Sequence, residues 1–358
     1  MATAPAARFA PPRPLIEGPS AWVGAEMRKS DEWLYRLTPA HIAELEDALR
    51  ATQARGLDIA QIGRADFPLP GLGPELLKIE DEIVNGRGFV LIRGIPVERY
   101  TIEEAARIYY GIGTWLGNAR SQNAKGHVLG HVRDLGLSAE KDPNVRIYQT
   151  TERQTYHTDS CDIVGLLCLK TAKSGGLSSI VSSMTIYNVM ATRRPDLAQR
   201  LMQPFATDRR GEVPSGKKPY FEIPVFNDHA GTLSVIYARR YIDSAQRFPE
   251  ARRLTAADVE ALDYFDSLAN DPELRLDMEF KPGDMQFLHN HTLLHDRTAY
   301  VDWDEPEKKR HLLRLWLAAP NGRELPPVYA ERYGSIAIGD RGGIICDGTR
   351  LHAPIEPV

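Results

Sequence analysis

The first residues in this sequence that suggest chemistry are a histidine and an aspartate in the segment Tyr156-His157-Thr158-Asp159. On a β-strand, side chains at positions i and i+2 point to the same side of the sheet. The imidazole of His157 and the carboxylate of Asp159 can therefore bind one metal ion together. A surface strand that carries a solvated histidine and aspartate is the competing interpretation of this short pair.

A second group of histidines lies in the segment HNHTLLH, where His289, His291 and His295 share one face if the chain is extended. Hydrogen-bonded histidines on an edge strand would explain this cluster alone. Combined with His157 and Asp159, however, it can supply two imidazoles and one carboxylate, which form the facial triad of Fe(II) oxygenases. Such a triad leaves coordination positions open for a chelating co-substrate and dioxygen, whereas a structural zinc site is closed.

Several segments resemble the taurine dioxygenase/TfdA-type family of Fe(II)- and 2-oxoglutarate-dependent oxygenases, which is related to clavaminate synthase. They are GFVLIRGIP, YHTDS, GGLSSIVSS and NHTLLHDRTAY with the following RHLLRLW. The resemblance covers about Ile79 to Leu325 and implies that His157 and Asp159 are the first two iron ligands. It selects His295 as the third, because the family's distal histidine follows an asparagine by five residues and Asn290 stands at that offset.

The resemblance also implies which residues hold 2-oxoglutarate. Arg310 and Arg314 share one face of the next predicted strand, and a guanidinium can bind a carboxylate through two parallel hydrogen bonds. By family position, Arg310 binds the C5 carboxylate, and Arg314 lies near the C1 carboxylate or an anionic group of the substrate. Ser178 aligns with a family threonine that hydrogen-bonds the C5 end, although Leu177 replaces the acidic residue often found before it. Arginines that only extend to the surface are the alternative.

The activity implied by the resemblance is hydroxylation of an unactivated C–H bond, with dioxygen consumed and succinate and CO2 released. Asp159 argues against a halogenase, because halogenating relatives replace this carboxylate with a small residue. Desaturation and ring closure stay open. The expected substrate is a small, carboxylate-bearing molecule.

Two segments are expected to line the substrate pocket. One is Gln122 to Arg133, which includes His127 and His131, and the other is Asp208 to Tyr220, a predicted lid. Solvated loops are the alternative for both. Basic side chains in the predicted lid would suit a carboxylate group, and these are Arg209, Arg210, Lys217 and Lys218.

Two other hypotheses belong to different classes. The spacing of His289, His291 and His295 resembles the first metal motif of cupins, with histidine in place of their usual glutamate. A cupin enzyme would bind its metal through these three residues without 2-oxoglutarate. The chain after His295 offers only His311 and His352 for a second cupin motif, without its Gly-Pro-Gly frame. The other hypothesis is a binding or sensing protein without activity, which the triad and both arginines argue against.

The composition of the 358-residue chain is that of a globular protein. Hydrophobic residues are 42%, and 44 Lys and Arg against 48 Asp and Glu give a net charge of −4, without the basic excess expected of a nucleic-acid or anionic-lipid binder. The three cysteines lack CxxC spacing, and no export signal or apolar run of about 20 residues is present. We expect a cytoplasmic enzyme with a small-molecule substrate and no nucleic-acid or membrane partner. The oligomeric state stays open, a homo-oligomer included.

Helices that could buttress the site are expected in the first third of the chain. The patterns predict helices over Thr38–Arg55, Pro74–Asn85 and Thr101–Leu116, with a strand at Phe89–Ile92. Thr38 is expected to cap the first helix, and Thr101 with Glu104 forms a capping-box pattern at the third.

From about Asn144 the sequence changes to short segments rich in β-branched and aromatic residues. One helix, Thr255–Ala269, is expected among strands in NVRIYQTT, DIVGLLCLKTA, LSSIVSS, YFEIPVFN, TLSVIYARRYI, MQFLHNHTLLH and RHLLRLWLAA. A series of short predicted strands is typical of a β-sandwich or barrel. With the resemblance, it predicts an α+β fold with a double-stranded β-helix (jelly-roll) core buttressed by helices. We expect a partly loose N-terminal arm at 1–37 and a single oxygenase domain at 38–358.

Overall fold

The computed structural model describes residues 11–137 and 145–357. The α-helices are α1 (Gly24–Met27), α2 (Pro39–Ala54), α3 (Leu72–Val84), α4 (Ile102–Leu116), α5 (Ser183–Arg193), α6 (Pro195–Leu201), α7 (Arg239–Ala245), α8 (Ala256–Ala269) and α9 (Ala330–Tyr333). The strands are β1 (Leu34–Arg36), β2 (Phe89–Arg93), β3 (Asn118–Ala119), β4 (Leu129–Val132), β5 (Gln154–His157), β6 (Ile163–Lys170), β7 (Ser174–Gly175), β8 (Ser178–Ser182), β9 (Pro204–Asp208), β10 (Tyr220–Pro224), β11 (Phe226–His229), β12 (Thr232–Val235), β13 (Arg275–Met278), β14 (Met285–His289), β15 (Leu293–Arg297), β16 (Tyr300–Val301), β17 (His311–Ala318), β18 (Ile336–Ala337) and β19 (Asp340–Arg341).

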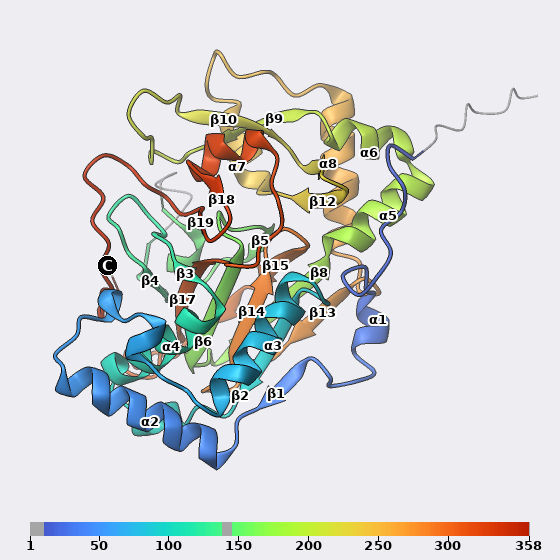
Figure 1. The fold of residues 1–358 in the computed structure, drawn as a ribbon. Coiled ribbons are helices and arrows are strands. Elements are labelled where there is room, and N and C mark those ends of the chain that lie inside the picture. Colours follow the sequence, from blue (N-terminus) through green and yellow to red (C-terminus); the bar gives the residue numbers. More distant parts are fainter. Residues whose placement is uncertain (1–10, 138–144, 358) are drawn as a thin grey trace, which may run out of the picture.

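Two sheets form the centre of the fold (Figure 1). The larger has the strand order β1-β2-β14-β6-β17-β3, with β4 also paired to β17, and the smaller has the order β13-β8-β15-β5. The turn after β14 carries the chain from the larger sheet into β15 of the smaller one. Together with the family relationship established below, this mixed arrangement confirms the predicted α+β jelly-roll class.

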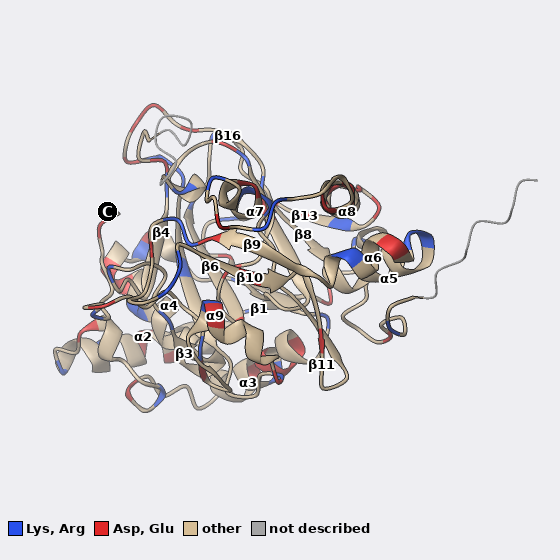
Figure 2. Ribbon diagram, turned by 90° about the horizontal axis from the view of Figure 1, so that it is seen from above, with Lys and Arg blue, Asp and Glu red and all other residues tan. Residues whose placement is uncertain are grey.

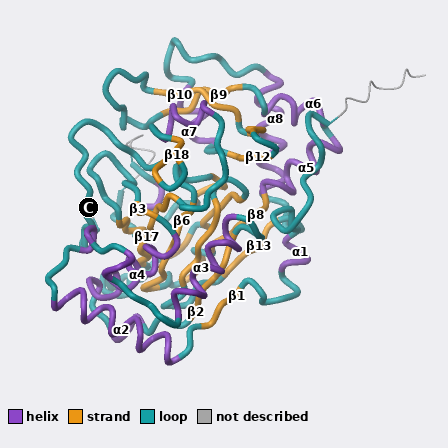
Figure 3. The backbone as a smooth tube through the Cα atoms, in the orientation of Figure 1, coloured by secondary structure: helices purple, strands orange, loops and turns teal. Residues whose placement is uncertain are grey.

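Helices cover the outer sides of both sheets, so that the strands lie at the centre of the molecule (Figure 3). Apolar residues of α2, α3 and α4 pack on the larger sheet, and those of α5, α6 and α8 pack on the smaller one. A third cluster of buried apolar residues fills the space between the sheets. Apolar residues therefore surround the space between the two sheets. A polar side chain that enters this space requires a hydrogen-bond or ion-pair partner.

The alternation of side chains along β15 and β17 decides which residues reach the interior. On β15, Leu293 packs between the sheets while Leu294 packs toward the helices, so His295 and Arg297 face the interior. On β17, Leu312 and Trp316 face the interior, which places Arg314 there as well. Both strands thus deliver charged side chains to the same space.

Most sequence-predicted helices and strands are confirmed. Thr38 and Thr101 cap α2 and α4, and Thr255 caps α8 as the third threonine of this kind. Helices α5 and α6, which follow β8 directly, were not expected from the sequence.

Three predicted strands need correction. Residues 147–149 of NVRIYQTT form a 3-10 helix, closed by a hydrogen bond from the Thr150 hydroxyl to the Ile147 carbonyl, and Asn144 lies outside the described residues. In TLSVIYARRYI the strand ends at Val235, and α7 follows, stabilised by an i,i+4 ion pair between Arg239 and Asp243. MQFLHNHTLLH is two strands joined by a turn.

Residues 11–37 of the predicted arm lie against the rest of the fold in this structure. Trp22 is buried and its indole N–H donates to the Arg87 carbonyl, while β1 pairs with β2 in parallel. Residues 1–10 lie outside the described part of the chain, and the division into an arm and a single domain stays a prediction.

Acidic and basic residues are interspersed along the outer helices (Figure 2). Within residues 11–137 and 145–357, no helix combines the length and apolar character needed to cross a membrane.

The capping box of α4 gives a first test of the fold. We expect Thr101→Ala to lower the free energy of unfolding by about 1 kcal/mol, because the Thr101 hydroxyl accepts from the Glu104 N–H at 3.2 Å. Urea denaturation measures the change. Thr101→Ser keeps the hydroxyl and should stay within about 0.5 kcal/mol of the wild type; an equal loss in both variants would show that the methyl group, not the cap, matters.

Candidate metal and co-substrate site

The structure brings His157, Asp159 and His295 together at the edge of the smaller sheet. His157 ends β5 and pairs across the sheet with His295 of β15, and Asp159 lies in the loop that follows β5. The two imidazole rings are 4.1 Å apart between centroids, and the candidate ligand atoms of the three residues all lie within 4.8 Å of one another. Two nitrogen donors and one carboxylate fit an octahedral metal with an open face, such as Fe(II).

Hydrogen bonds orient His157 and Asp159 at this cluster, whereas His295 Nδ1 has no hydrogen-bond partner in the described chain. His157 Nδ1 lies 2.9 Å from the Thr155 carbonyl, which favours a proton on Nδ1 and an unprotonated Nε2. Nε2 lies 2.9 Å from the Gln154 side-chain nitrogen, a contact that a metal ion would replace. The Trp316 indole donates to Asp159 Oδ2 at 2.8 Å, and the Asp159 backbone N–H donates to the side-chain oxygen of Asn290 at 2.9 Å. His157 Nε2 then lies 3.8 Å from Asp159 Oδ1, a separation that a shared ion can bridge.

The charges at this site also favour metal binding. Burial alone would raise the pKa of Asp159, but Arg314 and the two histidines, with the Trp316 hydrogen bond, lower the pKa below its ordinary value. Burial, followed by repulsion from His157, lowers the pKa of His295 to about 3. A carboxylate and neutral imidazoles are the protonation states that a metal ion requires.

The other two histidines of the HNHTLLH segment do not join this cluster. His289 ends β14 and His291 lies in the turn before β15, and both are fully buried. His291 Nε2 lies 2.8 Å from Asp162 Oδ1, and His289 Nδ1 lies 3.2 Å from the Thr292 hydroxyl. The prediction that three imidazoles share one face is therefore wrong, and the cupin ligand set is not assembled.

A cavity between the two sheets, here called the inner cavity, extends from the metal cluster. Its charged and polar lining includes His157, Ser178, His295, Asp296, Arg297, Arg310 and Arg314, of which Asp296 is paired with Arg153. Leu166 and Leu312 of the larger sheet provide apolar walls. This confirms that Arg310 and Arg314 face the same space, as their spacing predicts.

The inner cavity holds two buried arginines whose charge is not balanced by a carboxylate within ion-pair distance in the described chain. Arg310 is 4% exposed, its Nη1 has no hydrogen-bond partner, and burial lowers its pKa. Arg297 is 6% exposed and flanks the same tyrosine ring, Tyr300. A buried guanidinium without an anion is costly, so this end of the cavity fits a carboxylate.

Small residues make room beside Arg310. Gly176 has φ 69°, and a Cβ there would lie 3.0 Å from Arg310 Nε. Ser178 faces the cavity from β8, with its hydroxyl donating to Gln286 Oε1 at 3.0 Å. The site therefore has a cation, a hydroxyl and a shape that suit the distal end of a dicarboxylate.

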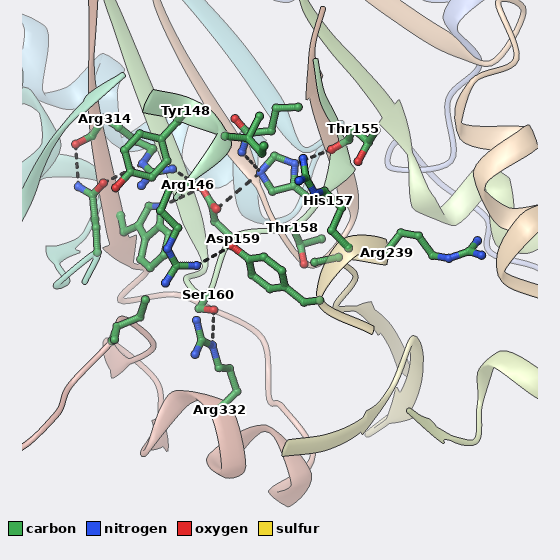
Figure 4. A pocket seen from close by; sticks show the side chains of 18 residues that line it. Arg146, Tyr148, Thr155, His157, Thr158, Asp159, Ser160, Arg239, Arg314 and Arg332 are labelled. Carbon is green, nitrogen blue, oxygen red and sulfur yellow. Dashed lines mark hydrogen bonds and ion pairs between the residues drawn. The ribbon is translucent and has the colours of Figure 1, made fainter. Parts of the chain in front are cut away.

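Arg314 lies between this cavity and a second one. Its Nε donates to Gln122 Oε1 at 2.7 Å, its Nη1 is 3.7 Å from Asp159 Oδ2, and its guanidinium stacks on Tyr148. The second cavity, here called the outer cavity, shares His157 and Arg314 with the inner one, and its wall also includes Arg146, Ser160, Tyr241 and Arg332. Figure 4 shows Arg146, Ser160, Arg314 and Arg332 around Asp159.

The predicted pocket segments are only partly right. Gln122 lines the outer cavity, but His127 packs against His352, and His131 Nδ1 lies 2.8 Å from His311 Nε2. His131 lies on β4, whose pairing with β17 brings it to His311, and His127 precedes β4 and forms an isolated bridge with His352.

Two of the four basic residues of the predicted lid are directed elsewhere, whereas Arg210 lies over the ring of Tyr241, which lines the outer cavity. Arg209 donates to the Glu331 carbonyl, and Lys217 pairs with the Glu331 carboxylate. From this loop it is Glu212 that reaches the outer cavity, through an ion pair with Arg146. Arg209 and Lys217 therefore give no support to a carboxylate-bearing substrate, which stays a prediction.

Three functional candidates were not expected from the sequence. Arg297 follows His295 by two positions on β15, and that period-2 spacing was the available signal. Arg146 and Arg332 carry no local signal, because tertiary contacts alone bring them to the cavity.

Known proteins provide an independent comparison. Residues 23–316 match the profile of the family described as taurine catabolism dioxygenase TauD, TfdA family. The chain is 33% identical over 319 residues to FR-33289 synthase of Streptomyces rubellomurinus, covering 87% of this chain and 92% of that protein. It is 33% identical over 304 residues to the taurine hydroxylase-like protein SAT17 of Stachybotrys chartarum, covering 82% and 77%.

A solved structure shows the same fold. Asparagine oxygenase in complex with Fe(II), 2S,3S-3-hydroxyasparagine and succinate superposes with a TM-score of 0.62 at 15% identity, over 80% of this chain and 93% of that one. The extent of the profile match and of the relatives confirms the predicted family and class of enzyme. The chain belongs to the TauD/TfdA family and is a 2-oxoglutarate-dependent dioxygenase that uses Fe(II) and dioxygen.

Proposed function

We propose that this enzyme hydroxylates a C–H bond of a small, carboxylate-bearing molecule held in the outer cavity. His157, Asp159 and His295 would hold Fe(II), and the observation that carries this assignment is the convergence of their donor atoms within 4.8 Å. When bound, the iron supplies dioxygen activation coupled to decarboxylation of 2-oxoglutarate. Hydroxylated substrate, succinate and CO2 are the products.

The two cavities have separate roles in this proposal. In the inner cavity Arg310, with Ser178 beside it, holds the C5 carboxylate of 2-oxoglutarate, and Arg314 neutralises the C1 end. In the outer cavity the substrate lies beside His157 and Asp159, on the other side of Arg314. The hydrogen bond from Trp316 and the ion pair with Arg314 keep Asp159 ionised and oriented.

Three further features of the proposal come from the sequence. The enzyme acts in the cytoplasm, consistent with three free cysteines. It needs no nucleic-acid or membrane partner. The carbon adjacent to iron is hydroxylated rather than halogenated, because Asp159 occupies the position at which a halide would have to bind.

The direct test is anaerobic addition of Fe(II) and then 2-oxoglutarate to the apoprotein. We expect a weak visible charge-transfer band that requires both additions, because chelation by the keto acid needs adjacent open positions on the metal. Fe(II) with succinate, which lacks the keto group, is the matched control and should give no band. A protein that retains zinc and gives no band would contradict the assignment.

Substrate class is tested by oxygen-dependent succinate release across a panel of small acids and their amides. Release stimulated by the acids and not by the amides supports a carboxylate-bearing substrate. The same panel followed by mass spectrometry should show a gain of one oxygen atom in the product.

A further inference from the structure

The outer cavity contains more positive charge than the metal and 2-oxoglutarate require. Five arginines line it, namely Arg146, Arg239, Arg240, Arg314 and Arg332, while Asp159 is the only acidic residue in its described wall. A substrate enters this space next to the metal cluster. Which of these arginines is available to bind the substrate depends on the partners that each already has.

Four of the five arginines already contact a carboxylate. Arg146 pairs with Glu212, and Arg314 lies 3.7 Å from Asp159. The other two arginines, which are neighbours in the sequence, also contact carboxylates. Arg239 pairs with Asp243, Asp263 and Asp266, and Arg240 lies 3.9 Å from Glu152. In Figure 4 the Arg239 side chain points away from the others.

Arg332 is the exception in the described part of the chain, since no carboxylate there lies within ion-pair distance of it. Its Nε donates to the Ser160 hydroxyl at 2.7 Å, and its guanidinium lies 5.6 Å from the centre of the Phe221 ring. Burial lowers its pKa, and the Arg146 charge adds to that effect while Glu212 opposes it. One guanidinium edge remains for a ligand, because a single Nε contact uses only part of its fork of donors.

The position of Arg332 relative to the metal cluster is defined by Ser160, the residue after Asp159. Figure 4 shows the Arg332 side chain reaching Ser160, on the same side of the cavity as Arg146. Arg146 donates to the Tyr241 hydroxyl at 2.6 Å, which places a phenol beside the two arginines. These groups form one polar end of the cavity, with the metal ligands at the other.

The segment that carries Arg332 is firmly attached beside the metal cluster. The Gly343 N–H donates to the Ser160 carbonyl at 2.7 Å, and the Ile344 N–H donates to the Ser121 carbonyl at 2.8 Å. Arg341 forms a fully buried ion pair with Asp162 at 2.9 Å. The match to the family profile ends at residue 316, so the profile does not cover this segment.

We propose that Arg332, supported by Arg146 and Tyr241, binds the anionic group of the primary substrate and so makes the C-terminal segment a specificity element. A carboxylate and a phosphoryl group share the chemistry that a guanidinium fork recognises. The inference rests on the proposed function, because it places the substrate in the outer cavity. It assigns substrate anion binding to Arg332 rather than to Arg314, which is engaged by Asp159 and Gln122.

The test is anion binding by the anaerobic enzyme saturated with Fe(II) and 2-oxoglutarate, which fills the inner cavity. Inorganic phosphate and acetate are titrated separately, and the shift in unfolding temperature reports each affinity. We expect the wild type to be stabilised by at least one of them. Arg332→Gln should weaken that affinity by at least about 30-fold, as expected when one partner of a buried charge pair is removed.

Controls separate the possible outcomes. Arg332→Lys keeps a charge without the fork and should give an intermediate affinity, and Arg50→Gln, on an exposed helix face, should match the wild type. A stronger response to phosphate than to acetate identifies a phosphoryl substrate, and the reverse a carboxylate.

Two results would overturn the inference: a wild type stabilised by neither anion, or equal affinities in Arg332→Gln and the wild type. The charge-transfer band is read in the same samples. Its absence from all of them would contradict the proposed function, while the anion titration would still report on Arg332.

Discussion

Replacing His157 with alanine is expected to abolish the charge-transfer band and to lower oxygen-dependent succinate release by about 10³-fold or more, equivalent to about 4 kcal/mol of lost barrier reduction. In the proposed site His157 supplies one of three protein ligands, and among the described residues no further histidine, cysteine or carboxylate joins this cluster. Anaerobic titration of Fe(II) with excess 2-oxoglutarate measures the loss directly.

His291→Ala is the matched comparison, because it also removes an imidazole from the same part of the fold. We expect this variant to keep the band per folded molecule, but to lose about 3 kcal/mol of unfolding free energy, since buried Asp162 loses a hydrogen-bond partner. If His291→Ala does not fold well enough to measure, His291→Gln keeps a donor and gives the same comparison. A band lost in the His291 variants and kept in His157→Ala would require the cupin ligand set.

Helix starts and strand faces could be predicted from the sequence because contacts between residues close together in the chain determine them. Thr38, Thr101 and Thr255 each cap the helix that follows, through contacts within three residues. Period-2 alternation likewise placed Arg310 and Arg314 on one face, because β17 is extended between two partners.

The reversal after β14 could not be predicted in the same way. The alternating side chains of HNHTLLH suggest one strand. The His291 imidazole, however, forms a hydrogen bond with Asp162, a residue far away in the sequence. That contact, with a hydrogen bond from the Asn290 N–H to the Asp162 carbonyl, fixes the turn that moves the chain between sheets. The family resemblance selected His295 among three histidines that lie in different environments, and the structure places His295 beside His157 and Asp159. Its role as a metal ligand remains a prediction.

The substrate side of the site depends almost entirely on long-range contacts. Lys217 and Arg209 looked available in the sequence, yet Glu331 satisfies both. Arg332 stands beside Glu331 in the same short helix and is directed to Ser160 instead. Local charge therefore says little about which cations remain free to bind a ligand, because the answer is set by which carboxylates the fold brings to them.

Arg310→Met is expected to weaken 2-oxoglutarate binding by about 100-fold, or about 3 kcal/mol, because the variant loses the buried cation proposed to bind the C5 carboxylate. The charge-transfer band should still form at saturating co-substrate, since the metal ligands are untouched. Pyruvate lacks the C5 carboxylate, so comparing the two keto acids measures what that carboxylate contributes to binding. The wild type should bind 2-oxoglutarate much more tightly than pyruvate, and the variant should lose most of that preference.

The stability of the same variant should change in the opposite direction to its affinity. In the absence of 2-oxoglutarate, Arg310 is a buried guanidinium with one nitrogen unpartnered and a pKa lowered by burial, so its charge disfavours folding. Methionine fills a similar volume without that charge, and we expect the unfolding temperature of apo Arg310→Met to equal or exceed that of the wild type. A guanidinium that served only the fold would instead leave the variant less stable and its preference for 2-oxoglutarate over pyruvate unchanged. Thermal unfolding with and without 2-oxoglutarate distinguishes the two roles, because only a ligand-binding arginine combines a stable apoprotein with lost stabilisation by the co-substrate.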